Sequence, residues 1–164
     1  MLRCSVPKTP IGSLRRKAKS RRKHVVQRLD GRFLLTSDLI PAQFLGWDDS
    51  FVIATQTGTN TNATAVPVSD DVFVDLGWTN VGSTTVSANT FTTRLELDGY
   101  TVGDFSTPFE LAQFGGAAFE DLGLGQLTLG SHTLRLIVDV ADDVVESDEN
   151  YNVREKRFFG DFSG

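Results

Sequence analysis

The chain has 164 residues, 40% of them hydrophobic, and a net charge of −5, which allows one domain with a tail. Its single cysteine, Cys4, excludes a disulfide within the chain, and no apolar run approaches the roughly 18 residues that a transmembrane helix needs. Eleven of the 16 Lys and Arg residues lie within residues 1–32, beside one of the 21 acidic residues. A basic head therefore precedes an acidic body, and the two are not expected to share a role.

The head has few apolar residues before Val25, and its like charges repel one another. Such a segment cannot bury enough surface to order itself, so we predict a disordered basic segment over residues 1–37. Within it, Val25, Val26, Leu29 and Phe33 have a spacing compatible with a short amphipathic helix over 24–35. The basic run alone would suggest nucleic acid, but no aromatic residues are interleaved and the acidic body would repel phosphates. We therefore expect no nucleic-acid partner.

The stretch RRKHVVQRLDGRFLLTSDL resembles LEPR-XLL, a basic N-terminal motif associated with exported bacterial proteins. The likeness rests on Leu29, Asp30, Arg32 and the closing Leu34-Leu35, and it fails at Val26-Gln27, where the motif has Leu-Glu. The resemblance implies export to the cell surface or the extracellular space. It implies no activity.

From Gln43 onward the hydrophobic period is two. One face of VFVDLGW carries Val72, Val74, Leu76 and Trp78; one face of FTTRLELD carries Phe91, Thr93, Leu95 and Leu97; and one face of HTLRLIVD carries Leu134, Leu136 and Val138. Alternation of this kind is typical of antiparallel strands that have one buried face. Asp98-Gly99 between two such runs predicts a two-residue hairpin turn. We expect Trp47 and Trp78 to lie in the core.

Recurrent turn signals divide the body into seven or eight short strands, which predicts an all-β antiparallel sandwich over residues 38–160, followed by a tail over 161–164. The stretch FELAQFGGAAFEDLGLG, from Phe109, is expected to form two strands joined at Gly115-Gly116. The segment Gly123–Gly130 has the wrong glycine spacing for a dinucleotide site, and we expect a loop there.

The segment DVADDVVESDENYNV, from Asp139 to Val153, is the one concentration of acidic residues. Asp, Asn and Ser favour turns because they accept hydrogen bonds from nearby backbone N–H groups, so a structural turn is one interpretation. A calcium site is another, since hard cations need six to eight oxygens. The candidate ligands are Asp139, Asp142, Asp143, Glu146, Asp148 and Glu149, although their spacing is not that of an EF-hand. A catalytic carboxylate pair would need a cleft that raises one pKa, and a solvated loop offers none.

This segment, with the strand before it, resembles the CARDB domain, a bacterial cell-adhesion-related module with an immunoglobulin-like fold. The likeness rests on Gly130–Leu134, Val138-Asp139 and the string from Val145 to Asn152; Asp148 replaces the usual Asn. Upstream, the matching positions are Asn80, Gly82, Phe91, Leu95, Asp98 and Gly99. The resemblance implies an immunoglobulin-like sandwich and makes the acidic string structural.

The two histidines, His24 and His132, lie in different segments, so they build neither a zinc site nor a Ser-His-Asp triad. We therefore expect no enzyme and no cofactor other than a possible calcium ion. The sequence indicates an exported, non-catalytic binding, adhesion or structural module whose partner is a protein or a surface glycan. A calcium-stabilised adhesion module is the alternative, and an enzyme with an unrecognised site is third.

Overall fold

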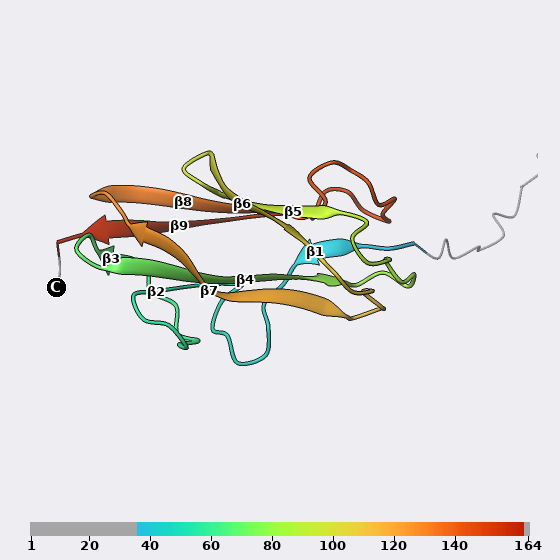
Figure 1. The fold of residues 1–164 in the computed structure, drawn as a ribbon, viewed down its shortest axis with the longest axis horizontal. Coiled ribbons are helices and arrows are strands. Elements are labelled where there is room, and N and C mark those ends of the chain that lie inside the picture. The colour runs from blue at the N-terminus through green and yellow to red at the C-terminus, as the bar shows by residue number, and fades with distance from the viewer. Residues whose placement is uncertain (1–35, 163–164) are drawn as a thin grey trace, which may run out of the picture. The chain divides into compact units, whose positions relative to one another are not determined.

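The computed structural model describes residues 36–162, which form nine strands and no helix (Figure 1). The strands are β1 (Leu39–Pro41), β2 (Phe51–Ala54), β3 (Ala65–Pro67), β4 (Asp71–Asn80), β5 (Thr92–Leu97), β6 (Tyr100–Ser106), β7 (Gly116–Gln126), β8 (Gly130–Ile137) and β9 (Val153–Asp161). The all-β prediction is confirmed, with one strand more than the expected maximum.

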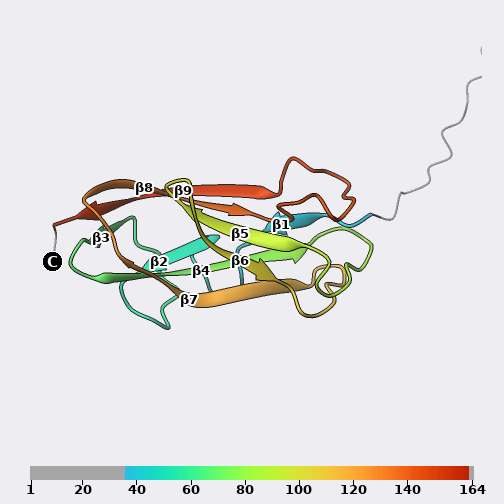
Figure 2. The same cartoon turned by 45° about the horizontal axis from the view of Figure 1, so that its top comes forward.

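Two sheets face each other as a sandwich (Figures 1 and 2). In the first sheet β7 pairs along one edge of β4, and β1 and β2 both pair along the other edge of β4. The second sheet has the order β3-β9-β8-β5-β6. All pairs are antiparallel except β3 with β9, which run parallel. The immunoglobulin-like sandwich expected from the sequence is therefore present.

The core is formed by the side chains that the alternating sequence pattern predicted to face inward. The four alternating side chains of β4 are fully buried, and the facing sheet contributes Leu95, Leu134, Leu136 and Phe158. Burying each such side chain stabilises the fold by about 1.5–3 kcal/mol, so the domain is held together without a disulfide. Trp78 donates its indole N–H to the Thr107 hydroxyl at 3.0 Å, so its one polar atom is satisfied inside the core. The predicted turn at Asp98-Gly99 is also present, and both residues have positive φ angles.

Two predictions between residues 109 and 130 are wrong. Residues 109–115 form no strand; Leu111 alone makes an isolated bridge with Val86, and one strand, β7, begins at Gly116. Residues 123–126, expected in a loop, continue β7 along β4. The pairing has two register shifts, and Gly125 has a positive φ, so the glycine-rich sequence is accommodated in an irregular ladder.

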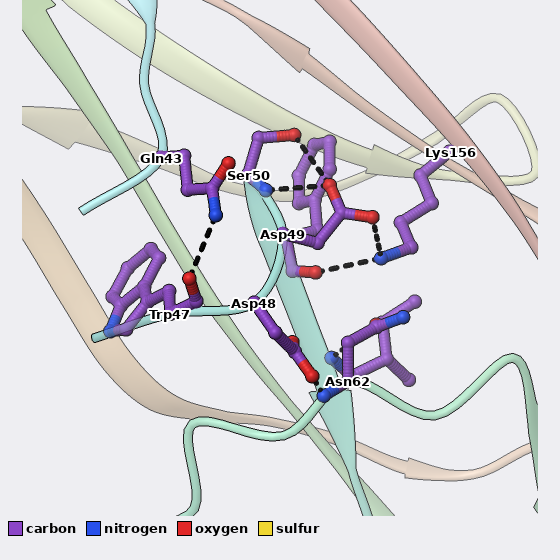
Figure 3. A network of polar contacts seen from close by, with 9 residues as sticks. Gln43, Trp47, Asp48, Asp49, Ser50, Asn62 and Lys156 are labelled. Atoms are coloured by element: carbon purple, nitrogen blue, oxygen red, sulfur yellow. Dashed lines mark hydrogen bonds and ion pairs between the residues drawn. The ribbon is translucent and has the colours of Figure 1, made fainter. Parts of the chain in front are cut away.

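A loop over residues 42–50 separates β1 from β2 and carries its own small apolar contact. Trp47 is buried, as expected, but it does not belong to the core cluster between the sheets. Its ring lies 5.3 Å from that of Phe44. Phe44 in turn lies against Gly77 and Gly116, where a Cβ atom would collide with its ring. The Gln43 side-chain amide donates to the Trp47 carbonyl at 2.7 Å and closes the loop (Figure 3). The loop is therefore folded onto the outer face of the first sheet.

The same loop is joined to the opposite sheet by one lysine side chain. Lys156 of β9 donates to the Asp49 carboxylate at 2.7 Å and to the Phe51 carbonyl at 2.8 Å (Figure 3). Its side chain is only 12% exposed. Burial works to raise the pKa of Asp49, but the contacts with Lys156 and with the Ser50 N–H group outweigh it and lower the pKa. The pair links the first and last thirds of the chain across the sandwich.

The predicted basic segment and its helix over 24–35 fall essentially outside the described residues, as does the LEPR-XLL likeness. The predicted tail also extends beyond them. Among residues 36–162 there is no helix of the length and apolar character that a membrane crossing requires.

Candidate functional site

The acidic segment connects β8 to β9 and lies at the end of the sandwich where β1 begins (Figure 1). Its first turn is organised by Asp139, which is 6% exposed. The two oxygens of this carboxylate accept the backbone N–H groups of Asp143 at 3.0 Å and Val144 at 2.8 Å. Asp139 and Asp142 both have positive φ angles, a conformation that Asp tolerates better than most residues. This part of the segment is a hydrogen-bonded turn.

Glu146 is the second buried carboxylate, and it ties the segment to the first strand. Its Oε2 accepts the N–H group of Leu39 at 2.8 Å, and its Oε1 accepts the side-chain amide of Asn152 at 3.3 Å. The backbone adds an isolated bridge between Ser37 and Glu146 and a bond from the Ser147 N–H to the Ser37 carbonyl. Partners 107 residues apart thus meet at one carboxylate.

The surroundings of Glu146 destabilise the ionised form of its carboxyl group. Burial, together with the nearby carboxylates of Glu149, Asp139 and Asp38, raises the pKa of Glu146 from 4.5 to about 7, against the opposing effect of the Leu39 N–H. A carboxyl group with this pKa exchanges its proton near neutrality. No sequence signal distinguished Glu146 from the other five acids, because its burial depends on β1.

The remaining candidates face solvent or serve local turns. Asp142, Asp143 and Glu149 are exposed and Asp148 is half-buried. Asp148 accepts both the backbone and side-chain N–H groups of Asn150, while Glu149 accepts the N–H of Glu146 at 3.0 Å. Across residues 36–162, no three His, Cys, Asp or Glu side chains converge as metal ligands would. The six acids are therefore not gathered into one site, and calcium binding stays a prediction.

Two polar atoms beside this segment nevertheless lack partners. Asn152 is 8% exposed and its Oδ1 accepts no hydrogen bond, and the Oδ1 atom of Asp38 is likewise buried without a donor. Asp38 Oδ2 accepts the Ser147 hydroxyl at 2.8 Å. Buried polar atoms are nearly always satisfied, so these two acceptors are exceptions in the described domain.

Asn80 gives the physical reason for one of the motif positions. This fully buried residue donates its amide to the carbonyls of Thr84 and Leu111, at 2.7 and 3.0 Å, and its Oδ1 accepts the N–H groups of Asp38 and Gly82. One side chain thus fastens the segment before β1, the loop after β4 and the crossing before β7. Any Cβ at position 82 would meet the backbone of residues 36–38, so only Gly fits there.

His132 forms a polar pair that sequence reasoning missed. Its Nδ1 lies 2.7 Å from Asp98 Oδ2 and its Nε2 lies 2.8 Å from the Thr128 carbonyl. Both partners are acceptors, so a ring that donates from both nitrogens is the protonated form. Burial works to lower the pKa of His132, but the Thr128 carbonyl and the Asp98 carboxylate together raise it. The nitrogen that would activate a nucleophile in a hydrolase faces a carbonyl instead.

Away from the acidic segment, Leu45 and Phe114 form an exposed apolar surface on the outer face of the first sheet. They flank a hollow of about 200 Å³ whose lining has no charged residue. Leu45 is fully exposed, and Phe114, 75% exposed, has a φ of 61°. Its N–H donates to the Asn80 carbonyl at 2.7 Å, which holds this conformation. An exposed aromatic ring in a rarely adopted backbone conformation is a feature of binding surfaces.

No known protein-family profile matches the sequence, and no curated protein matches it either. The fold does have matches among solved structures. The CARDB domain of a Pyrococcus furiosus protein, solved in complex with di-metal ions, superposes with a TM-score of 0.58 at 17% identity, over 77% of this chain and 94% of that one. The body of this chain has the CARDB fold.

A second structure supports the same assignment. A domain of a Methanosarcina acetivorans protein described as a "putative cell surface protein" matches with a TM-score of 0.53 at 18% identity, over 76% of this chain and 92% of that one. The solution structure of the Pyrococcus furiosus CARDB domain matches with a TM-score of 0.58 at 16% identity, over 78% and 98%. The CARDB likeness suggested by the motif residues is therefore confirmed at the level of fold.

Proposed function

We propose that this chain is an exported, non-catalytic binding module of the cell surface, with its CARDB-type domain engaging a protein or a glycan. The fold carries the proposal, because a related solved domain belongs to a protein described as a cell surface protein. The roles of the buried polar residues support the proposal. Asp139, Glu146, Asn80 and His132 hold backbone segments together, and none of them lines the cleft at β1 or the hollow beside Phe114.

The proposal is tested on intact cells of the source organism. Externally added protease should digest the chain while a cytoplasmic marker survives, and fluorescently labelled full chain should bind the cells saturably and be displaced by unlabelled chain. Protection of the chain until the cells are lysed would overturn export, and binding without saturation would overturn the role as a specific binding module. Replacing Leu45 and Phe114 with Ser, compared with the same change at the exposed Leu129, tests whether the apolar surface contributes.

A calcium-stabilised module is the second candidate, and the unpartnered Oδ1 atoms of Asn152 and Asp38 beside Glu146 favour it. A structural relative was solved in complex with di-metal ions. Because no three acidic ligands converge among the described residues, a cation would have to draw Glu149 or Asp38 toward Glu146. A ligand bound only by the folded state stabilises it by about 2.7 kcal/mol at a hundredfold excess over its dissociation constant. A melting temperature of the full chain that is equal in calcium and in EDTA would end this alternative.

A further inference from the structure

One cavity of the described domain is not lined by the buried acids Asp139 and Glu146. It is a cleft of about 300 Å³ between β1 and the start of β9, two elements that lie side by side in Figures 1 and 2. Asp38, Tyr151 and Arg154 form its polar part, and Ile40, Pro41 and Val81 are its main aliphatic residues. The volume lies at the lower end of small-molecule sites, roughly 300–1,000 Å³. It therefore suits one or two small rings.

The polar side chains of the cleft have spare binding capacity. Arg154 is exposed, and its side chain makes no hydrogen bond or ion pair with any residue from 36 to 162. Asp38 uses Oδ2 for Ser147, while its Oδ1 has no donor. Asp38 lines the cleft, and its carboxylate carries this unfilled acceptor. One guanidinium and one carboxylate are thus available together.

Tyr151 supplies the third element, an aromatic ring that is 66% exposed at the rim. An exposed ring beside aliphatic side chains is a flat apolar surface, on which the C–H face of a ring-shaped ligand can pack. The phenol hydroxyl can also donate or accept. The cleft therefore combines a stacking surface with donors and an acceptor.

The charge of the surroundings decides the class of ligand. A net anionic ligand would lie close to Asp38, which lines the cleft and already repels Glu146. A net cationic ligand would instead meet Arg154 at the cleft wall. A neutral polyhydroxyl ring satisfies both sides, since its hydroxyl groups donate to Asp38 and accept from Arg154 without bringing a charge out of water.

We infer that the cleft between β1 and β9 is a sugar-binding site for the neutral hexose units of a polysaccharide, with Tyr151 under the ring and Asp38 and Arg154 on its hydroxyl groups. This inference rests on the proposed binding function and specifies its ligand. The remaining wall residue, Val153, extends the apolar surface at the start of β9.

The test is isothermal titration of the full chain with three neutral probes: cellohexaose, maltohexaose and chitohexaose. Tetragalacturonate serves as the acidic probe and hexalysine as the basic one. We expect at least one neutral probe to bind, and Tyr151→Ala and Arg154→Gln each to weaken it roughly tenfold or more, because each removes a direct contact. The matched controls Tyr100→Ala and Arg157→Gln, exposed residues outside the cleft, should bind as the unmodified chain does.

Other outcomes separate the inference from the function on which it rests. Binding of tetragalacturonate or hexalysine alone, or failure of all three neutral probes, overturns the assignment of a neutral-sugar site. Equal losses in the Tyr100 and Tyr151 variants overturn the assignment to this cleft. If the sugar probes fail while labelled chain still binds intact cells, the proposed binding function stands and only its ligand is wrong. Circular dichroism of each variant excludes unfolding as the cause.

Discussion

Replacing Glu146 with Gln gives the sharpest test of the polar organisation at the β1 end of the sandwich. The amide keeps the shape of the side chain and an oxygen that can accept the Leu39 N–H, but it has no proton to exchange. In the unmodified protein the pKa of Glu146 is raised from 4.5 to about 7 in the folded state. Between these two values the folded state holds one proton more than the unfolded state.

The sign of the pH dependence follows from that extra proton. The free energy of unfolding falls as pH rises wherever the folded state binds more protons, by up to about 1.4 kcal/mol per pH unit for one proton. Below the unfolded value both states are protonated, and above the folded value both are ionised. The window is therefore pH 4.5 to about 7, and the whole change due to Glu146 is about 3 kcal/mol.

The assay is urea unfolding of both proteins at intervals from pH 5 to pH 8. The Glu146→Gln variant should be nearly as stable as the unmodified chain at pH 5, and it should gain on it by about 2–3 kcal/mol by pH 8. Glu110→Gln, which changes an exposed acid at the same end of the sandwich, controls for the general loss of negative charge. Parallel stability curves for the unmodified chain and the Glu146 variant would refute the burial and charge repulsion assigned to this carboxylate.

Three further predictions concern other parts of the sandwich. Lys156→Met should lower the free energy of unfolding by roughly 1–3 kcal/mol, because it removes the bonds to Asp49 and the Phe51 carbonyl; an unchanged urea midpoint would contradict the link between the sheets. Gly77→Ala should destabilise by roughly 1–3 kcal/mol, whereas Gly123→Ala, where a Cβ meets only one ring at 3.9 Å, should cost less in the same melts. The pKa of His132 is higher in the folded state than in the unfolded state, so this residue stabilises the fold fully at pH values below the unfolded pKa, and the stabilisation is lost as pH rises through the folded pKa. His132→Gln should therefore flatten this decline in the free energy of unfolding, and equal slopes for the two proteins above pH 6.5 would disprove the prediction.

Local patterns predicted the parts of the fold that local physics determines. The alternating residues of β4, β5 and β8 face the core because a strand has a period of two, whatever its partners are. The Asp98-Gly99 turn depends on two residues that tolerate positive φ. The prediction for the segment from Phe109 to Gln126 was wrong because the structure of this segment depends on distant partners. Leu111 is buried beside its isolated bridge to Val86, and the glycine-rich end of β7 is held in a strand by pairing with β4. Neither partner is visible in the segment itself.

The candidate site shows the same division. The acidic string was expected either to form a turn or to bind calcium, and Asp139 and Asp148 indeed cap backbone N–H groups within five residues of themselves. What the sequence could not indicate is that Glu146 is buried, because its burial and its bond to Leu39 require a strand 107 residues away. The pairs Lys156–Asp49 and His132–Asp98 were missed for the same reason, since each joins residues that only the sandwich brings together.

These long-range contacts also explain why the cleft between β1 and β9 lies where it does. Glu146 and Asn80 hold the backbone just before and at the start of β1, through the N–H groups of Leu39 and Asp38. Lys156 holds β9 against the beginning of β2. The two strands that border the cleft are therefore each held by side-chain hydrogen bonds. A site built in this way loses little conformational entropy on binding, so weak individual contacts to a neutral ligand can suffice.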